Sequence, residues 1–266
     1  MFNFVYKHMD FAHKLDGSTL PPDDFKKHMH DHYELLMLVD GIIDYTVESE
    51  TRRLQHGEIL IMKPGDLHFG SVDLSTPYER YVLKFSADML PDWLLTKLNE
   101  CPTFGNRLSV NSYKVFEEFD DIYSDSEDKD TEERYLLMYC LLLKILVDIY
   151  KYNDRRTSDH LSSKNIFIDK ITGYINDNIQ KTITLEEICH ELHYSKSYIS
   201  SEFSKELKTP IMTYIKYKKI IAAHKEIMEG CEKTAEIAEK YGFKEYSTFY
   251  RNYIKIIGHP PLSDKH

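Results

Sequence analysis

An internal repeat constrains the carboxy-terminal part of this chain more than any other feature. The segment LEEICHELHYS at 185–195 aligns with TAEIAEKYGFK at 234–244, and the segments that follow each of them also align. In each copy the apolar residues recur at helical spacing, which predicts a short helix, a tight turn and a second helix. Two such copies joined by a long helix over 211–229 indicate a tandem pair of helix-turn-helix units.

The residue types inside each copy explain how the two helices would cross. A small residue in the first helix, Cys189 or Ala238, permits a close approach of the second helix. A turn position follows, with His193 in one copy and Gly242 in the other. The second helix of such a unit can enter the major groove of DNA. A helical pair that merely packs in a core is the alternative for one copy, and the duplication argues against it.

The region 164–266 resembles the DNA-binding domain of the AraC/XylS family of transcription regulators. The resemblance rests on ITLEEICHELHYSKSYISSEFSKEL, on the linker helix PIMTYIKYKKIIAAHKEIM, and on EIAEKYGFKEYSTFYRNYIKIIGHPP, which carries the family's EIA, GF, F, G and P series. The chain departs from the family pattern in having Lys208 for a glycine, Lys219 for an arginine, Tyr253 and Ile254 for a Phe-Lys pair, and Pro260 for a threonine.

The resemblance implies that the two second helices read bases of double-stranded DNA in successive major grooves, about one turn or ~34 Å apart. Arg251 is the strongest base-reading candidate, because a guanidinium binds guanine O6 and N7 in bidentate fashion. The base-facing positions that the resemblance assigns are Ser197, Ser200, Ser201, Tyr246, Ser247, Tyr250 and Arg251. The candidate phosphate contacts are Lys196, Lys205, Lys218, Lys219 and Lys244, for each of which a solvated surface position is the alternative.

Residues 1–85 have the pattern of a small β-domain. Short apolar runs such as LLMLVDG and EILIMKPG are separated by turn residues, and Ile43, Tyr45 and Val47 alternate with polar residues. Alternation of this kind is typical of half-buried strands, and several short strands favour a barrel or a sandwich.

A histidine motif within this β-domain resembles the motifs of the cupin barrel. His28, His30 and Glu34 match the first cupin motif, and His68 follows Pro64-Gly65 in the second. Side chains at i and i+2 on a strand point the same way, so His28 and His30 would face one ligand. Three imidazoles with a carboxylate suit Zn, Fe, Mn or Ni, so the pocket is a candidate site for a divalent metal. Metal-free contacts with a polar ligand and purely structural hydrogen bonds remain the alternatives.

Residues 86–152 are expected to be helical and to contain a dimerisation region. The segment ERYLLMYCLLLKILVDIYKY is apolar around most of its circumference, so a helix there must be buried on more than one side. It would lie under the β-domain or against the same helix of a second subunit. Residues 153–163 lack periodicity and are rich in Asp, Ser and Arg, which indicates a linker.

Charge is distributed unevenly along the chain. Residues 164–266 hold 16 basic and 14 acidic side chains, whereas residues 1–163 hold 18 basic and 30 acidic ones. The acidic half is unsuited to contact with phosphates. Four separated cysteines, the lack of a signal peptide at the amino terminus and the lack of a membrane-spanning run point to a cytoplasmic protein with no membrane partner.

These features predict an α+β protein with an amino-terminal cupin-like β-barrel, appended helices and a carboxy-terminal all-α domain of two helix-turn-helix units. We expect a homodimeric, ligand-responsive, sequence-specific transcription regulator without enzymatic activity, sensing a sugar or another small metabolite. A metal-dependent cupin enzyme tethered to DNA is the alternative. The sequence leaves the effector, the operator, and the choice between activator and repressor open.

Overall fold

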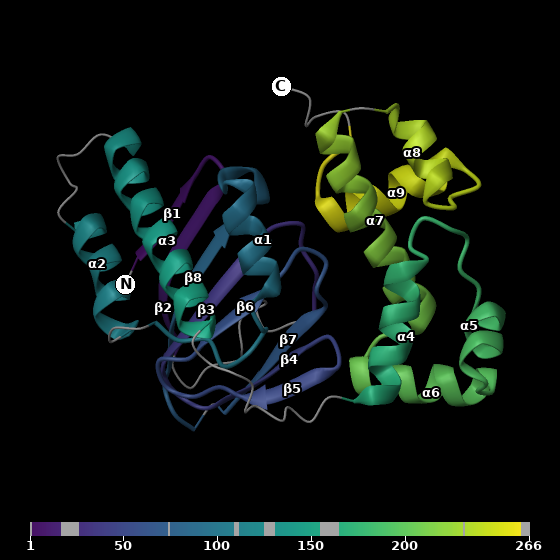
Figure 1. The fold of residues 1–266 in the computed structure, drawn as a ribbon, viewed down its shortest axis with the longest axis horizontal. Helices are drawn as coiled ribbons and strands as arrows, with labels where there is room; N and C mark the ends of the chain where they lie inside the picture. The colour runs from purple at the N-terminus through teal and green to yellow at the C-terminus, as the bar shows by residue number, and fades with distance from the viewer. Residues whose placement is uncertain are drawn as a thin grey trace.

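The computed structural model describes residues 2–16, 27–73, 75–108, 112–124, 131–154, 165–230 and 232–261. A β-rich amino-terminal part lies beside an entirely helical carboxy-terminal part (Figure 1), so the predicted α+β class is confirmed. The expected linker at 153–163 lies outside the described residues, apart from its first two positions, which end a helix.

The amino-terminal strands form two antiparallel sheets. The larger sheet has the order β1-β2-β8-β3-β6, and the smaller one has the order β5-β4-β7. Among the described residues these strands make a two-sheet, cupin-like arrangement and do not close into one continuous barrel. The strands are β1 (Phe2–Tyr6), β2 (Met9–Asp16), β3 (Tyr33–Asp40), β4 (Ile43–Val47), β5 (Glu50–Arg53), β6 (Ile59–Met62), β7 (His68–Val72) and β8 (Tyr78–Phe85).

Strand β3 explains why the run LLMLV lacks polar residues. Leu35 and Met37 belong to a core shared with helices on the outside of the larger sheet. Leu36 and Leu38, one position out of phase, belong to the core that β3 shares with strand β4 of the smaller sheet. Successive strand residues point to opposite faces, so a strand covered on both sides must be apolar throughout.

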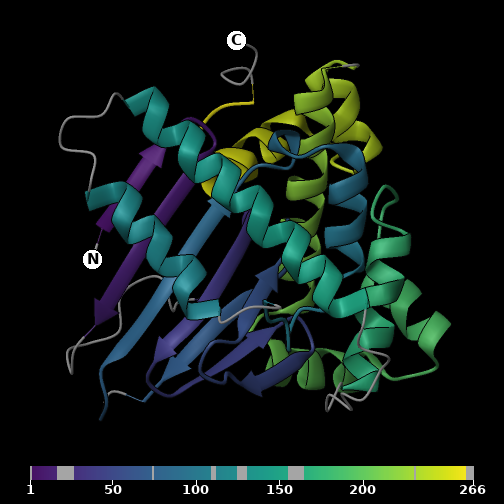
Figure 2. The same cartoon turned by 60° about the vertical axis from the view of Figure 1, so that its left-hand side comes forward.

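Three helices cover the outer face of the larger sheet (Figure 2). They are α1 (Asp92–Glu100), which follows a 3-10 turn at Ala87–Met89, α2 (Ser112–Ser124) and α3 (Thr131–Asp154). Helix α3 buries Met138, Leu142 and Ile145 completely in this core, so of the two expected placements the one against the β-domain is observed. Leu136 is 58% exposed and Leu137 is 36% exposed, so α3 retains a second apolar edge on its outer side.

Capping side chains and a glycine delimit the carboxy-terminal helices. Thr184 caps α5 through a capping box with Glu187, Ser195 caps α6, and Gly230 ends α7 in a left-handed conformation. Each cap satisfies backbone groups that the helix itself leaves unpaired. The helices are α4 (Ile166–Asp177), α5 (Leu185–Leu192), α6 (Lys196–Leu207), α7 (Ile211–Glu229), α8 (Thr234–Lys240) and α9 (Tyr246–Ile257).

Helix α7 belongs to both helix-turn-helix units. Its first half supplies Ile211 and Tyr214 to the core around α4, α5 and α6. Its second half supplies Ile220 and Ile227 to the core around α8 and α9. One rigid helix therefore sets the relative position of α6 and α9.

The two turns of the repeat adopt the same backbone conformation. His193 has φ 58° and Gly242 has φ 78°, both in the left-handed region. A glycine adopts this region without strain, whereas other L-residues incur about 1–2 kcal/mol. Lys208, which replaces the family's glycine, also lies there with φ 50°, so the turn is preserved despite the replacement.

Substitutions at the paired turn positions should change stability in opposite directions. A Cβ at Gly242 would lie 3.1 Å from Nζ of Lys219 and 3.3 Å from Cα of Thr182, so Gly242→Ala combines strain with crowding. We expect Gly242→Ala to lower the free energy of unfolding by about 1–2 kcal/mol, and His193→Gly, at an exposed turn, to raise it by about 1 kcal/mol. Urea unfolding followed by circular dichroism measures both, and shifts of the same sign would contradict the shared turn geometry.

Candidate effector pocket and DNA interface

The histidine motif is assembled from three segments of the β-domain. The segment before β3 lies antiparallel to the start of β7, where the backbone N–H groups of His28 and His68 each donate to the other residue's carbonyl at 3.1 Å. Glu34 is the second residue of β3. The bridge and the strand start bring His28, His30, Glu34 and His68 together, with one ligand atom from each lying within 4.8 Å of all the others.

Close contacts link the four side chains in pairs. Nε2 of His68 lies 3.1 Å from Nε2 of His28, and Nε2 of His30 lies 3.0 Å from Oε2 of Glu34. Glu34 and His68 are buried, and His28 and His30 are partly buried. The four residues therefore form one compact polar cluster, named here the histidine pocket, inside an otherwise apolar domain.

Two backbone carbonyls determine which nitrogen faces the pocket. Nδ1 of His30 lies 2.9 Å from the carbonyl of His32, and Nδ1 of His68 lies 2.9 Å from the carbonyl of Asp66. A carbonyl only accepts hydrogen bonds, so both Nδ1 atoms carry a proton and donate it. In the neutral imidazole, the Nε2 lone pairs of both residues then point into the pocket.

Burial keeps these imidazoles neutral. It lowers the pKa of His30 below its ordinary value and lowers the pKa of His68 to about 3, because a charged ring loses its hydration. Burial alone would raise the pKa of Glu34, but a hydrogen bond from the protonated form of His30 outweighs burial, so the pKa of Glu34 lies below its ordinary value. The pocket thus holds an ionised carboxylate facing imidazole lone pairs.

This donor set fits a divalent metal ion. The Nε2 lone pair of His30 and the Glu34 carboxylate face each other at 3.0 Å, and both are acceptors when His30 is neutral. A cation bound between them removes that conflict, and imidazole nitrogens with a carboxylate oxygen suit transition metals. The carbonyls behind His30 and His68 orient the rings as outer partners of metal-ligating histidines commonly do. Lys84, which the sequence did not single out, adds positive charge 4.0 Å from Glu34.

The predicted base-reading residues lie on α6 and α9, the second helices of the two units. Ser197 and Ser201 are exposed, and Ser200 is partly exposed, on α6. On α9, Tyr246, Ser247, Tyr250 and Arg251 are all exposed. Nε of Arg251 lies 3.3 Å from the carbonyl of Ser247, one turn earlier, while the opposite side of the helix buries Phe249 and Tyr253.

The five candidate phosphate-contacting lysines separate into surface and internal residues. Lys244 is exposed, and Lys196 and Lys205 are exposed residues paired with neighbouring glutamates. Lys218 is instead paired with Glu48 of the β-domain at 3.0 Å. These four remain candidates, and Lys218 would first have to leave Glu48.

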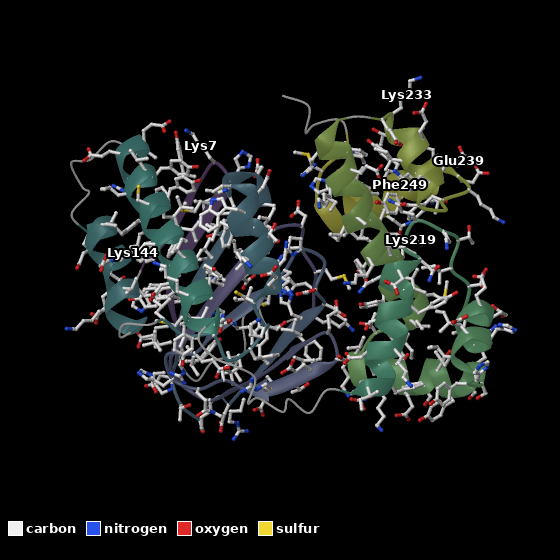
Figure 3. All side chains as sticks on the ribbon, in the orientation of Figure 1. Lys7, Lys144, Lys219, Lys233, Glu239 and Phe249 are labelled. Carbon is white, nitrogen blue, oxygen red and sulfur yellow. The ribbon has the colours of Figure 1, made fainter. Side chains whose placement is uncertain are left out.

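Lys219 requires a correction. Its side chain is 6% exposed and lies inside the helical domain, as does Phe249, whereas Lys233 lies at the outer edge (Figure 3). Nζ of Lys219 donates to the carbonyls of Lys181 and Tyr241, at 2.5 Å and 2.7 Å. It therefore ties the α4–α5 loop to the end of α8, and in this structure it is unavailable to a phosphate.

Among the described helices, none combines the length and apolar character that crossing a bilayer requires.

Comparisons with known proteins identify both halves of the chain. Residues 18–142 match the model of the AraC-like ligand binding domain, and residues 188–264 match that of a helix-turn-helix domain. The chain is 23% identical over 239 residues to the uncharacterized HTH-type transcriptional regulator YdiP of Escherichia coli, spanning 88% of this chain and 78% of that protein.

Two further comparisons cover different shares of this chain. The multiple antibiotic resistance protein MarA of Escherichia coli is 28% identical over 107 residues, spanning 40% of this chain and 80% of MarA. The solved structure of ToxT from Vibrio cholerae covers 97% of each chain at 14% identity with a TM-score of 0.40. The two domain matches together span about three quarters of the sequence, in the order seen in the structure. The chain therefore belongs to the AraC family of transcription regulators, with a ligand-binding domain followed by a DNA-binding domain.

Proposed function

We propose that this regulator binds its effector in the histidine pocket and reads two successive major grooves of DNA with α6 and α9. The observation that carries the proposal is the inward-facing set of His28, His30, Glu34 and His68 on the same chain as two exposed recognition helices. In this arrangement the domain of residues 1–85 senses the effector, and residues 164–266 bind the operator.

A divalent transition metal ion is the occupant that best matches the pocket. The pocket presents three imidazoles and a carboxylate whose ligand atoms lie within 4.8 Å of one another, a set that suits a transition metal ion. A sugar or another small metabolite that contacts these side chains directly is the metal-free alternative. A bound metal ion would neutralise Glu34 and offer a coordination position to an anionic or polar metabolite.

The outer edge of α3 supports the homodimer. Leu136 and Leu137 are exposed apolar residues of α3, and they directly precede Met138, which belongs to the buried face of the same helix. A second copy of α3 laid against this edge would cover them, and it would pair two DNA-binding domains for two half-sites. Helices 86–152 would then serve both as a cover for the larger sheet and as the dimerisation region.

Arg251 should contribute both affinity and sequence preference. We expect Arg251→Ala to weaken operator binding by about 1–3 kcal/mol and to relax the preference at one base pair, because a bidentate contact with guanine is lost. Arg251→Lys keeps the charge and loses the planar fork, so it should recover non-specific affinity without the preference. Gel-shift titrations on the operator and on single-base variants measure this, and an equal loss on all sequences would contradict base reading by Arg251.

Zinc should stabilise the unaltered chain through the histidine pocket. At a free zinc concentration of 100 times the Kd, binding adds about 2.7 kcal/mol to the stability of the folded state, which a thermal-shift assay detects as a higher Tm. We expect His68→Gln to abolish this shift, and His190→Gln, on the exposed surface of α5, to keep it.

The same assay tests the occupant. If zinc raises the Tm of His68→Gln as much as that of the unaltered chain, the metal binds elsewhere on the chain. A shift produced by a sugar in the presence of a chelator, with none produced by zinc, would contradict a metal occupant and favour the metal-free pocket.

A further inference from the structure

The segments that carry the pocket's histidines also contact the DNA-binding domain. Met29 and Leu67, neighbours of His28 and His68, are buried in the same apolar cluster as Ile171 of α4 and Tyr214 of α7. Gly65 approaches α7 so closely that an added Cβ would lie 3.4 Å from Cγ2 of Ile221. The sensor domain is therefore packed directly on the helix shared by both helix-turn-helix units.

Polar contacts reinforce this docking on α7. Oδ2 of Asp31 lies 2.7 Å from Nε2 of His224. Glu48, in the turn between β4 and β5, accepts a hydrogen bond from the Tyr214 hydroxyl at 2.6 Å and pairs with Nζ of Lys218 at 3.0 Å. Glu48 also accepts from the backbone N–H of Leu67 at 3.1 Å, so it joins α7 to the segment that leads into His68.

Strand geometry connects the two sets of contacts. In the extended segment 28–31, His28 and His30 face the pocket, whereas Met29 and Asp31 face the DNA-binding domain. The segment that enters β7 repeats the pattern, with Leu67 outward and His68 inward. Successive residues of an extended chain point to opposite sides, so one short bridge of backbone serves both the pocket and the interface.

The backbone turn at Glu48 places its carboxylate at the interface. Glu48 and Ser49 form the two-residue turn between β4 and β5, in which Val47 pairs with Glu50, and this kind of turn favours the φ of 51° found at Glu48. The contacts present here are the hydrogen bonds to Tyr214, Lys218 and Leu67, two of which cross the interface.

We propose that metal occupancy of the histidine pocket and docking of the sensor domain on α7 are thermodynamically coupled, each strengthening the other. This inference rests on the metal occupant proposed above. A metal ion held by His28, His30 and His68 fixes segments 28–31 and 65–68 in the conformation that presents Met29, Asp31 and Leu67 to α7. Docking then needs less ordering of these segments, which is the origin of positive coupling.

The coupling has a consequence for DNA recognition. Helix α7 contributes to the cores that hold both α6 and α9, so a sensor domain docked on α7 restrains both recognition helices. The docked form also engages Lys218 with Glu48, which withholds a candidate phosphate contact. Metal occupancy thereby favours the form of the chain in which the sensor domain is docked on α7.

Reciprocity gives a test that leaves the pocket itself unaltered. If metal binding strengthens docking by some factor, docking strengthens metal binding by that same factor, so a variant that loosens docking must bind the metal more weakly. Lys218→Met removes the ion pair with Glu48 but keeps the aliphatic stem, and Lys216→Met makes the same change at an exposed position of the same helix. Tyr214→Phe removes only the hydroxyl bound to Glu48, and Tyr217→Phe is its matched control.

We expect Lys218→Met and Tyr214→Phe to lower the zinc affinity of the full chain about 5- to 10-fold, within the usual range of coupling between sites. The two control variants should bind zinc as the unaltered chain does. Competition against a chromogenic chelator measures the affinities, and circular dichroism verifies that each variant is folded. In the unaltered chain, zinc should also slow hydrogen exchange in segment 65–68, and this slowing should be reduced in Lys218→Met.

The outcomes separate the two proposals. Stoichiometric zinc binding with equal affinity in Lys218→Met and Lys216→Met would overturn the coupling and leave the metal occupant intact. Failure of the unaltered chain to bind zinc would overturn the metal occupant and the coupling with it. Tighter zinc binding in Lys218→Met would overturn the proposed sign, because docking would then oppose occupancy.

Discussion

The backbone bridge between His28 and His68 is the interaction on which the sensor domain depends. Its two hydrogen bonds attach the segment before β3 to the start of β7, and thereby bring imidazoles from two separate motifs to within 3.1 Å of each other. The same bridge turns Met29 and Leu67 outward into the core of the DNA-binding domain. This pairing therefore contributes both to the polar pocket and to the surface that packs on α7.

Helix α7 connects the surface that the sensor domain contacts to both helix-turn-helix units. It packs with α4, α5 and α6 at one end and with α8 and α9 at the other, so it contributes to the cores of both units. Lys219 adds polar bonds between the α4–α5 loop and the end of α8. Burying a lysine costs less where its ammonium is hydrogen-bonded, and these two carbonyls give the Lys219 ammonium its partners inside the domain.

The sequence predicted the elements whose signals are local. Turn positions such as His193 and Gly242 act within a few residues, so their consequences follow from the neighbouring residue types alone. The histidine pocket was also predictable, because the i, i+2 spacing of His28 and His30 places both rings on one side of a strand. The docking of Glu48 on Lys218 was not, since 170 residues separate the two and their charges resemble those of any solvated pair. Only the tertiary arrangement distinguishes Lys218 and Lys219 from the lysines that remain exposed.

Two turns in the left-handed backbone conformation also take part in the interface between the domains. Among the described residues, the non-glycine positions with positive φ are Lys7, Glu48, His193 and Lys208. Two of them belong to the sensor–DNA-binding interface, since Glu48 binds α7 and the carbonyl of Lys208 accepts a hydrogen bond from Lys27 of the sensor domain. The turn between β4 and β5 and the end of α6 favour this conformation locally, and both also make contacts that cross between the domains. The contact at position 208 uses the backbone carbonyl, which a glycine would offer equally, so the lysine that stands in place of the family's glycine preserves the docked arrangement but is not required by it.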